Sequence, residues 1–156
     1  MNEAWFSSLG EPLGAAERAE IAAYLAGLDM AAPVDSVSSW PQAAQVCRGA
    51  AGPWWDAEEA ERARLEQRTT LDPADPEWLA LNEVLHGAAA VAAARAGCAD
   101  PAHIRAAAGS AAYAAYPARL ARAAGAPPGH PFLRKYALYC GGRWPLGVYN
   151  GRFVIF

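Results

Sequence analysis

Residues 76–125 read PEWLALNEVLHGAAAVAAARAGCADPAHIRAAAGSAAYAAYPARLARAAG. Alanine has the highest helix propensity and dominates this stretch; the whole chain contains 40 alanines. Asp75 and Asp100 are each followed by proline, which is typical of helix starts because aspartate caps the first turn and proline is tolerated inside it. The stretch therefore predicts two long helices that end near Gly97 and Gly125. Their alanine-rich faces predict a closely packed antiparallel pair.

Outside this stretch, apolar periodicity and capping residues predict four further helices. Pro117 lies inside the second long helix and predicts a kink or a break near Tyr116, because proline removes a backbone donor and crowds the preceding turn. The segment 29–39 is rich in Pro, Ser and Asp and predicts a loop. The additional helices are expected over residues 15–28, 39–49, 57–69 and 131–139.

The sequence RWPLGVYNGRFVIF at 143–156 predicts a β-hairpin. Asn150-Gly151 fits a two-residue type I′ turn, and Pro145 fits an outer edge because it cannot donate to a ladder. A lone hairpin is marginal in water, so we expect it to pack on the helices or to gain strands from elsewhere. The expected pairs are Tyr149–Arg152, Val148–Phe153, Gly147–Val154 and Leu146–Ile155. One buried face is expected to hold Trp144, Leu146, Val148, Phe153 and Ile155.

These elements predict a mainly α (α+β) fold: one domain over 1–156, a bundle of four to six helices with a C-terminal hairpin at 143–156. We find no apolar stretch of spanning length and no secretory signal, so we expect a cytoplasmic protein with no membrane contact. The three cysteines are far apart without a CxxC motif, which argues against a disulfide scaffold or a zinc ribbon.

Charge is distributed unevenly along the chain. Residues 1–78 carry fourteen acidic residues and five arginines, whereas 79–156 carry two acidic residues, seven arginines and one lysine. Either the two halves neutralise each other inside one molecule, or the basic half serves an anionic partner. We expect an exposed basic surface only at Arg134, Lys135 and Arg143, which lack acidic neighbours in the sequence.

Motifs with catalytic or metal-binding chemistry are weak. Glu83-x-x-His86 matches half of a di-iron signature, and Asp100-x-x-His103 is a partial second copy whose aspartate is committed as a helix cap. Glu83 and His86 are therefore weak metal candidates, and we expect no bound metal and no cofactor. Cys47 is a weak nucleophile candidate near a helix end, where the dipole disfavours a thiolate. No Walker loop, GxSxG, GxGxxG or HExxH motif occurs.

The sequence therefore favours binding over catalysis. We expect a small soluble intracellular binding protein (a bacterial immunity-type protein, an inhibitor or an accessory factor) that acts on a protein partner or a small anionic ligand; nucleic acid is an unlikely partner because the chain is acidic overall. The alternative is a small enzyme or small-molecule-binding protein with its site between the helices and the hairpin. The expected binding residues are His130, Arg134, Lys135, Arg143 and Trp144; no catalytic residue is assigned.

Overall fold

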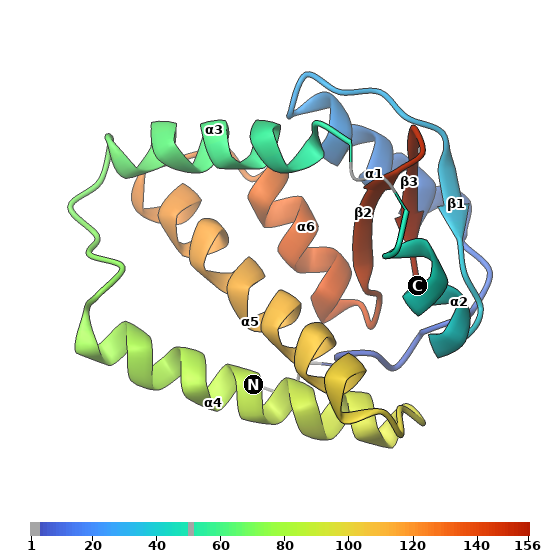
Figure 1. Ribbon diagram of the computed structural model, residues 1–156. Helices are drawn as coiled ribbons and strands as arrows, with labels where there is room; N and C mark the ends of the chain where they lie inside the picture. Colours follow the sequence, from blue (N-terminus) through green and yellow to red (C-terminus); the bar gives the residue numbers. More distant parts are fainter. Residues whose placement is uncertain (1–3, 50–51) are drawn as a thin grey trace.

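A computed structural model describes residues 4–49 and 52–156 (Figure 1). The described residues form six helices and a small three-stranded sheet, so the predicted fold class is confirmed. The elements are α1 (Ala15–Ala26), β1 (Val34–Ser36), α2 (Trp40–Val46), α3 (Trp54–Glu66), α4 (Pro76–Arg95), α5 (Pro101–Ala123), α6 (Pro131–Cys140), β2 (Pro145–Tyr149) and β3 (Arg152–Ile155).

Local capping explains where several helices begin. The Ser39 hydroxyl accepts from the Gln42 amide at the start of α2, and Asp75 and Asp100 accept from amides in the first turns of α4 and α5. Each of these three helices has a proline in its first turn, as the sequence predicts. His130 caps α6 through Nδ1, which accepts from the Phe132 amide at 3.3 Å.

The central helix α5 runs diagonally between α3 and α4 (Figure 1). It is continuous from 101 to 123, so of the kink or break that the sequence predicts near Tyr116, the break does not occur. Tyr116, Pro117 and the flanking alanines are buried, and tertiary packing over this turn compensates for the single backbone hydrogen bond that Pro117 removes. Ala89 and Ala93 of α4 are fully buried in the core cluster that contains the α5 alanines, so the alanine-rich faces meet as predicted.

The sheet has the order β1–β3–β2, with β3 in the centre. β2 and β3 form the predicted antiparallel hairpin, and Asn150 and Gly151 have φ values of 51° and 73°, as a type I′ turn requires. β1 pairs parallel with β3, so the expected loop over 29–39 contains a strand. The hairpin thus gains a third strand, and tertiary pairing overrides the local turn-rich composition.

The hairpin register departs from the prediction at one residue. The Tyr149, Val148 and Gly147 pairs are confirmed, but Ile155 pairs with Pro145, and Leu146 is an extra residue in a bulge. Gly147 has a φ of 123°, which permits the bulge, and a Cβ there would lie 2.7 Å from the Trp54 ring.

The bulge also divides the single buried face that the sequence predicts. Val148, Phe153 and Ile155 pack with the buried residues of α1, whereas Trp144 and Leu146 pack in the larger helical core. Both faces of the hairpin are therefore buried, one in the cluster that contains the α1 residues and the other in the larger helical core.

Candidate functional site

Lys135 lies on α6, and the sequence predicts that it is exposed. In the structure its side chain lies inside the protein, where α6 faces α1 and α3. Its Nζ donates to both carboxylate oxygens of Glu58, at 2.8 and 2.7 Å, and lies 4.4 Å from the Trp54 ring centroid. The Tyr24 hydroxyl donates to Glu58 at 2.6 Å and accepts from the Trp54 indole nitrogen at 2.6 Å. Burial lowers the pKa of Lys135, although Glu58 opposes this shift, and burial raises the pKa of Tyr24. This network is a buried structural element.

Arg143 is also buried, with 4% of its surface exposed. Its guanidinium forms an ion pair with Glu17 at 2.7 Å and donates to the backbone carbonyls of Ser8, Glu11 and Pro12. These contacts fasten the N-terminal segment to the loop before β2. The predicted exposure of Lys135 and Arg143 is therefore wrong, because each cation meets an acidic group that is distant in the sequence.

The other expected binding residues also have structural partners. Arg134 pairs with Glu20 at the surface and donates to the Gly129 carbonyl at 2.9 Å. His130 Nε2 lies 3.0 Å from a Glu61 oxygen, and Trp144 is buried in an aromatic cluster. A binding role for these residues stays a prediction, and they do not share one exposed surface.

The uneven charge distribution has a structural explanation. Ion pairs join basic residues of the second half to acidic residues of the first, so the two halves neutralise each other within the molecule. The pairs are Arg119–Asp75, Arg134–Glu20, Lys135–Glu58, Arg143–Glu17 and Arg152–Asp35.

The weak nucleophile candidate, Cys47, lies at the end of a different helix from the weak metal candidates, Glu83 and His86. Glu83 is exposed and His86 is half-buried on α4, and Cys47 is exposed at the C-terminal end of α2. Over residues 4–49 and 52–156, no three His, Cys, Asp or Glu side chains lie close enough to hold a metal ion. None of these residues therefore marks a site by its geometry.

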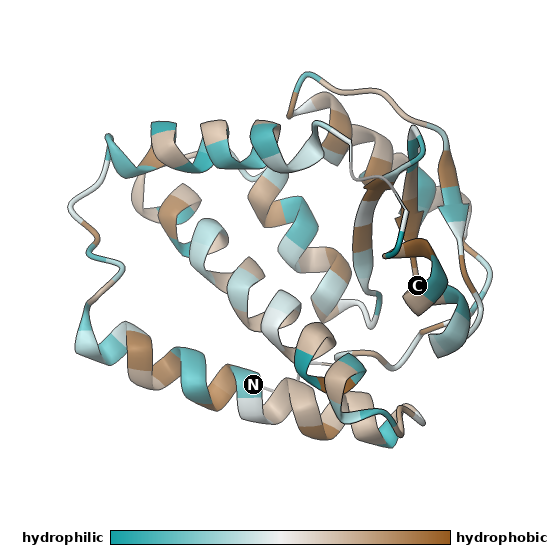
Figure 2. Cartoon of the chain, viewed as in Figure 1, coloured by the Kyte–Doolittle hydropathy of each residue, from teal (hydrophilic) through white to brown (hydrophobic). Residues whose placement is uncertain are grey.

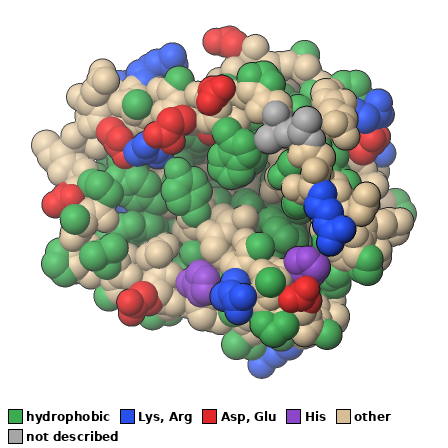
Figure 3. Space-filling view, viewed as in Figure 1, with side chains coloured by type: hydrophobic (Ala, Val, Ile, Leu, Met, Phe, Trp, Pro, Cys, Tyr) green, Lys and Arg blue, Asp and Glu red, His purple; other side chains and the backbone are tan. Residues whose placement is uncertain are grey.

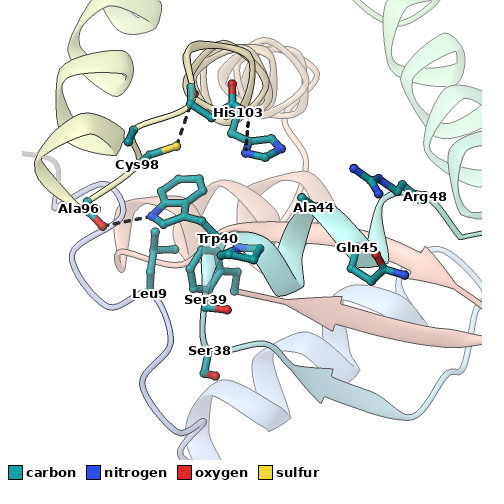
Figure 4. A pocket seen from close by; sticks show the side chains of 15 residues that line it. Leu9, Ser38, Ser39, Trp40, Ala44, Gln45, Arg48, Ala96, Cys98 and His103 are labelled. Atoms are coloured by element: carbon teal, nitrogen blue, oxygen red, sulfur yellow. Dashed lines mark hydrogen bonds and ion pairs between the residues drawn. The ribbon is translucent and has the colours of Figure 1, made fainter.

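An open cleft of about 790 Å³ lies in the described part of the chain (Figure 4). It lies between α2 on one side and the turn from α4 to α5 on the other, and Phe156 also lines it. Trp40 is the central aromatic surface, and its indole nitrogen donates to the Ala96 carbonyl at 3.1 Å. This bond joins α2 to the end of α4 and fixes the ring in the cleft.

An aspartate–histidine pair lies on the α5 side of the cleft. Asp100 caps α5 through Oδ1, which accepts from the Ala102 amide at 2.8 Å, and its Oδ2 lies 3.4 Å from His103 Nδ1. The Asp100 carboxylate thus orients the imidazole, whose ring points into the cleft above Trp40 (Figure 4). No hydrogen bond within the described residues engages His103 Nε2, so this nitrogen is available to a ligand.

Cys98 lies beside this pair but is poorly suited to nucleophilic chemistry. It is buried, and its thiol donates to the Asp100 backbone carbonyl at 3.6 Å. Burial raises the pKa of Cys98, so the group is a thiol at neutral pH. Cys98 therefore forms part of the wall and is not an activated nucleophile.

Arg48 supplies the cationic group of the cleft. It follows α2, is exposed, and extends its side chain toward the side of the cleft where His103 lies (Figure 4). None of the ion pairs among the described residues involves Arg48. An unpaired guanidinium at the rim of an aromatic cleft can bind a carboxylate or a similar anion in bidentate geometry.

A second hollow, of about 340 Å³, lies between α3, α4 and α5, where Figure 3 shows hydrophobic side chains gathered. Two of its polar side chains already have partners: Arg62 pairs with Glu59 and Glu66, and the Tyr116 hydroxyl donates to Glu66 at 3.4 Å. The cleft at Trp40 is the better candidate site, because no described residue forms an ion pair with Arg48 or a hydrogen bond with His103 Nε2.

The sequence contains recognisable signals at some residues of this cleft, but no pattern that marks the cleft itself. Asp100-x-x-His103 was visible as a motif fragment, and Ser39 and Asp100 were visible as caps. No sequence motif joins Trp40 and Arg48 to Asp100 and His103, because only the fold brings the end of α4 to the start of α2.

The fold and the cleft define a small α+β protein with a candidate ligand cleft. Comparison with known protein families, curated proteins and solved structures finds none that matches the chain. Among the described helices, none combines the length and the apolar character needed to cross a membrane.

Proposed function

We propose that the protein is a binding protein whose ligand is a small organic anion with an apolar or aromatic body, held in the cleft at Trp40. The observation that carries this proposal is the unpaired Arg48 guanidinium at the rim of a cleft with an aromatic wall. The cleft volume of about 790 Å³ falls in the range typical of small-molecule sites.

The chemistry of the lining supports an anion with an apolar body. Arg48 would bind the anionic group, and Leu9, Trp40 and Phe156 offer apolar surface to the body of the ligand. The acidic group of the cleft, Asp100, is compensated by the α5 N-terminus and by His103, so it opposes an anion less than a bare carboxylate would.

The test is binding of aromatic carboxylates compared with the matched neutral amides, measured by ligand-observed NMR and calorimetry. Arg48→Ala is expected to weaken carboxylate binding by about tenfold or more, because a charge-assisted hydrogen bond contributes about 1.5–3 kcal/mol. Arg18→Ala is the matched control, since Arg18 is an exposed arginine of α1 that does not line the cleft. Equal binding of acids and amides, or equal affinity of wild type and Arg48→Ala, would refute the proposal.

The second candidate function is an enzyme of small molecules that uses His103 as a general acid or base. The observation that favours it is the Asp100–His103 contact of 3.4 Å, which orients the ring toward the cleft. The same NMR samples test it, because a bound compound that is converted over hours would indicate turnover. His103→Asn should then abolish conversion and leave binding by Arg48 in place.

A further inference from the structure

Helix α4 has an unusually apolar outer surface. Its twenty residues contain only three charged side chains, Glu77, Glu83 and Arg95, and it lies at the margin of the molecule (Figures 1 and 2). Val84 and Val91 are 67% and 51% exposed, although their side chains are apolar. Exposed apolar side chains gathered on one helix surface indicate an interface.

The exposed residues form one regular stripe. Six exposed positions follow one another at alternating spacings of four and three residues, which is the spacing of a helix–helix seam. Positions so spaced share one face of a helix. The stripe consists of Glu77, Leu81, Val84, Ala88, Val91 and Arg95.

The stripe is self-complementary when two copies of α4 run antiparallel. The stripe positions are symmetric about residue 86: each stripe residue before His86 has a stripe residue the same number of positions after it. Two antiparallel copies of α4 that cross at His86 therefore bring each stripe residue opposite its counterpart on the other copy. An acidic residue then faces a basic one at both ends, and a larger apolar side chain faces a smaller one in between. The matched pairs are Glu77 with Arg95, Leu81 with Val91, and Val84 with Ala88.

The end charges are available for this pairing. Neither Glu77 nor Arg95 takes part in the ion pairs found among the described residues, whereas most basic residues of the second half do. A parallel arrangement would instead bring Glu77 against its own copy and Arg95 against its own copy, and like charges in contact are destabilising. The charges therefore select the antiparallel orientation.

We propose that two copies of the chain associate through the α4 stripe as an antiparallel, two-fold symmetric dimer. The helix is about 30 Å long and 10 Å wide, which gives a footprint of roughly 300 Å². Standard interfaces bury about 800 Å² per partner, so the dimer is weak and reversible, with a dissociation constant in the micromolar range or above.

The experiment is sedimentation equilibrium of the purified full-length chain over a concentration series from about 1 μM to about 1 mM. Glu77→Arg and Arg95→Glu each place like charges at both ends and are expected to weaken association about tenfold or more. The double variant Glu77→Arg/Arg95→Glu restores opposite charges and is expected to restore association. Glu83→Arg is the matched control, because Glu83 is an exposed acid of the same helix that lies off the stripe and has no ion-pair partner among the described residues.

Mixing the two single variants gives a second readout. The pair then has arginines at 77 and 95 on one chain and glutamates at both positions on the other, so the mixed dimer should form more tightly than either variant alone. Val84→Glu, at a largely exposed position, should abolish association without changing the circular dichroism spectrum.

Three outcomes would overturn the proposal. If the chain is monomeric at every concentration, the stripe does not join two copies of the chain. Equal association of Glu77→Arg and Glu83→Arg would show that the stripe is not the interface. A double variant no tighter than the single ones would exclude the antiparallel register.

Discussion

Lys135→Met is expected to lower the free energy of unfolding by about 3–5 kcal/mol, because it breaks a buried ion pair and leaves one charge behind. Both oxygens of Glu58 lie within 2.8 Å of the Lys135 ammonium, and only 6% of each residue is exposed. Methionine has a similar length and keeps apolar contact with Trp54. In the variant, the Tyr24 hydroxyl is the one remaining donor to Glu58 among the interactions described.

The neighbouring residue provides a matched control. Arg134 lies on the same helix and pairs with Glu20 at the surface, where an ion pair contributes about 0–1 kcal/mol. For a chain of this size, 1 kcal/mol shifts Tm by about 2–4 °C. Lys135→Met should therefore lower Tm by about 6–20 °C, and Arg134→Met by no more than about 4 °C, in parallel thermal and urea unfolding experiments.

A third variant separates loss of charge balance from loss of packing. Glu58→Gln combined with Lys135→Met removes both charges but keeps a side-chain oxygen that can accept from Tyr24. This double variant should be more stable than Lys135→Met alone, because no uncompensated charge remains buried. The reasoning fails if Lys135→Met unfolds together with Arg134→Met, or if the double variant is no more stable than the single one.

Three further predictions follow from the same structure. Gly147→Ala should lower the free energy of unfolding by about 2–5 kcal/mol, since a Cβ would lie 2.7 Å from the Trp54 ring at a φ of 123°. Gly151→Ala, which has open space around it, should lower the same free energy by about 1–2 kcal/mol, and calorimetry compares the two variants. Arg143→Met should speed amide hydrogen exchange in residues 5–13, because the carbonyls of this segment lose their donor. The Arg143 hydrogen bond lowers the pKa of Glu17 below its usual value of 4.5. The Glu17–Arg143 pair therefore stabilises the folded state above about pH 4.5, and this stabilisation is lost as the pH falls through the lowered pKa of Glu17 in the folded state. The difference in the free energy of unfolding between wild type and Glu17→Gln should therefore be constant above about pH 4.5 and become smaller below it. Urea unfolding curves recorded at a series of acidic pH values measure this difference.

Sequence alone determined the features that depend on a few neighbouring residues. Aspartate before proline marks the starts of α4 and α5, and Asn150-Gly151 fixes the hairpin turn and its first three pairs. These signals are local, because a cap or a turn involves groups within about four residues of one another. The sequence also shows that charge is divided between the halves, but not whether the basic residues face outward.

Only the tertiary structure decided the features that join distant segments. Arg143 and Glu17 are 126 positions apart, and β1 is a strand because β3 offers it an edge. The bulge at Leu146 places Gly147 against the Trp54 ring, which comes from a distant helix. The cleft at Trp40 exists because the end of α4 returns to the start of α2, and no local pattern encodes that approach. Long-range contacts depend on which surfaces remain to be buried once the helices and the hairpin have formed, and this is a property of the whole chain.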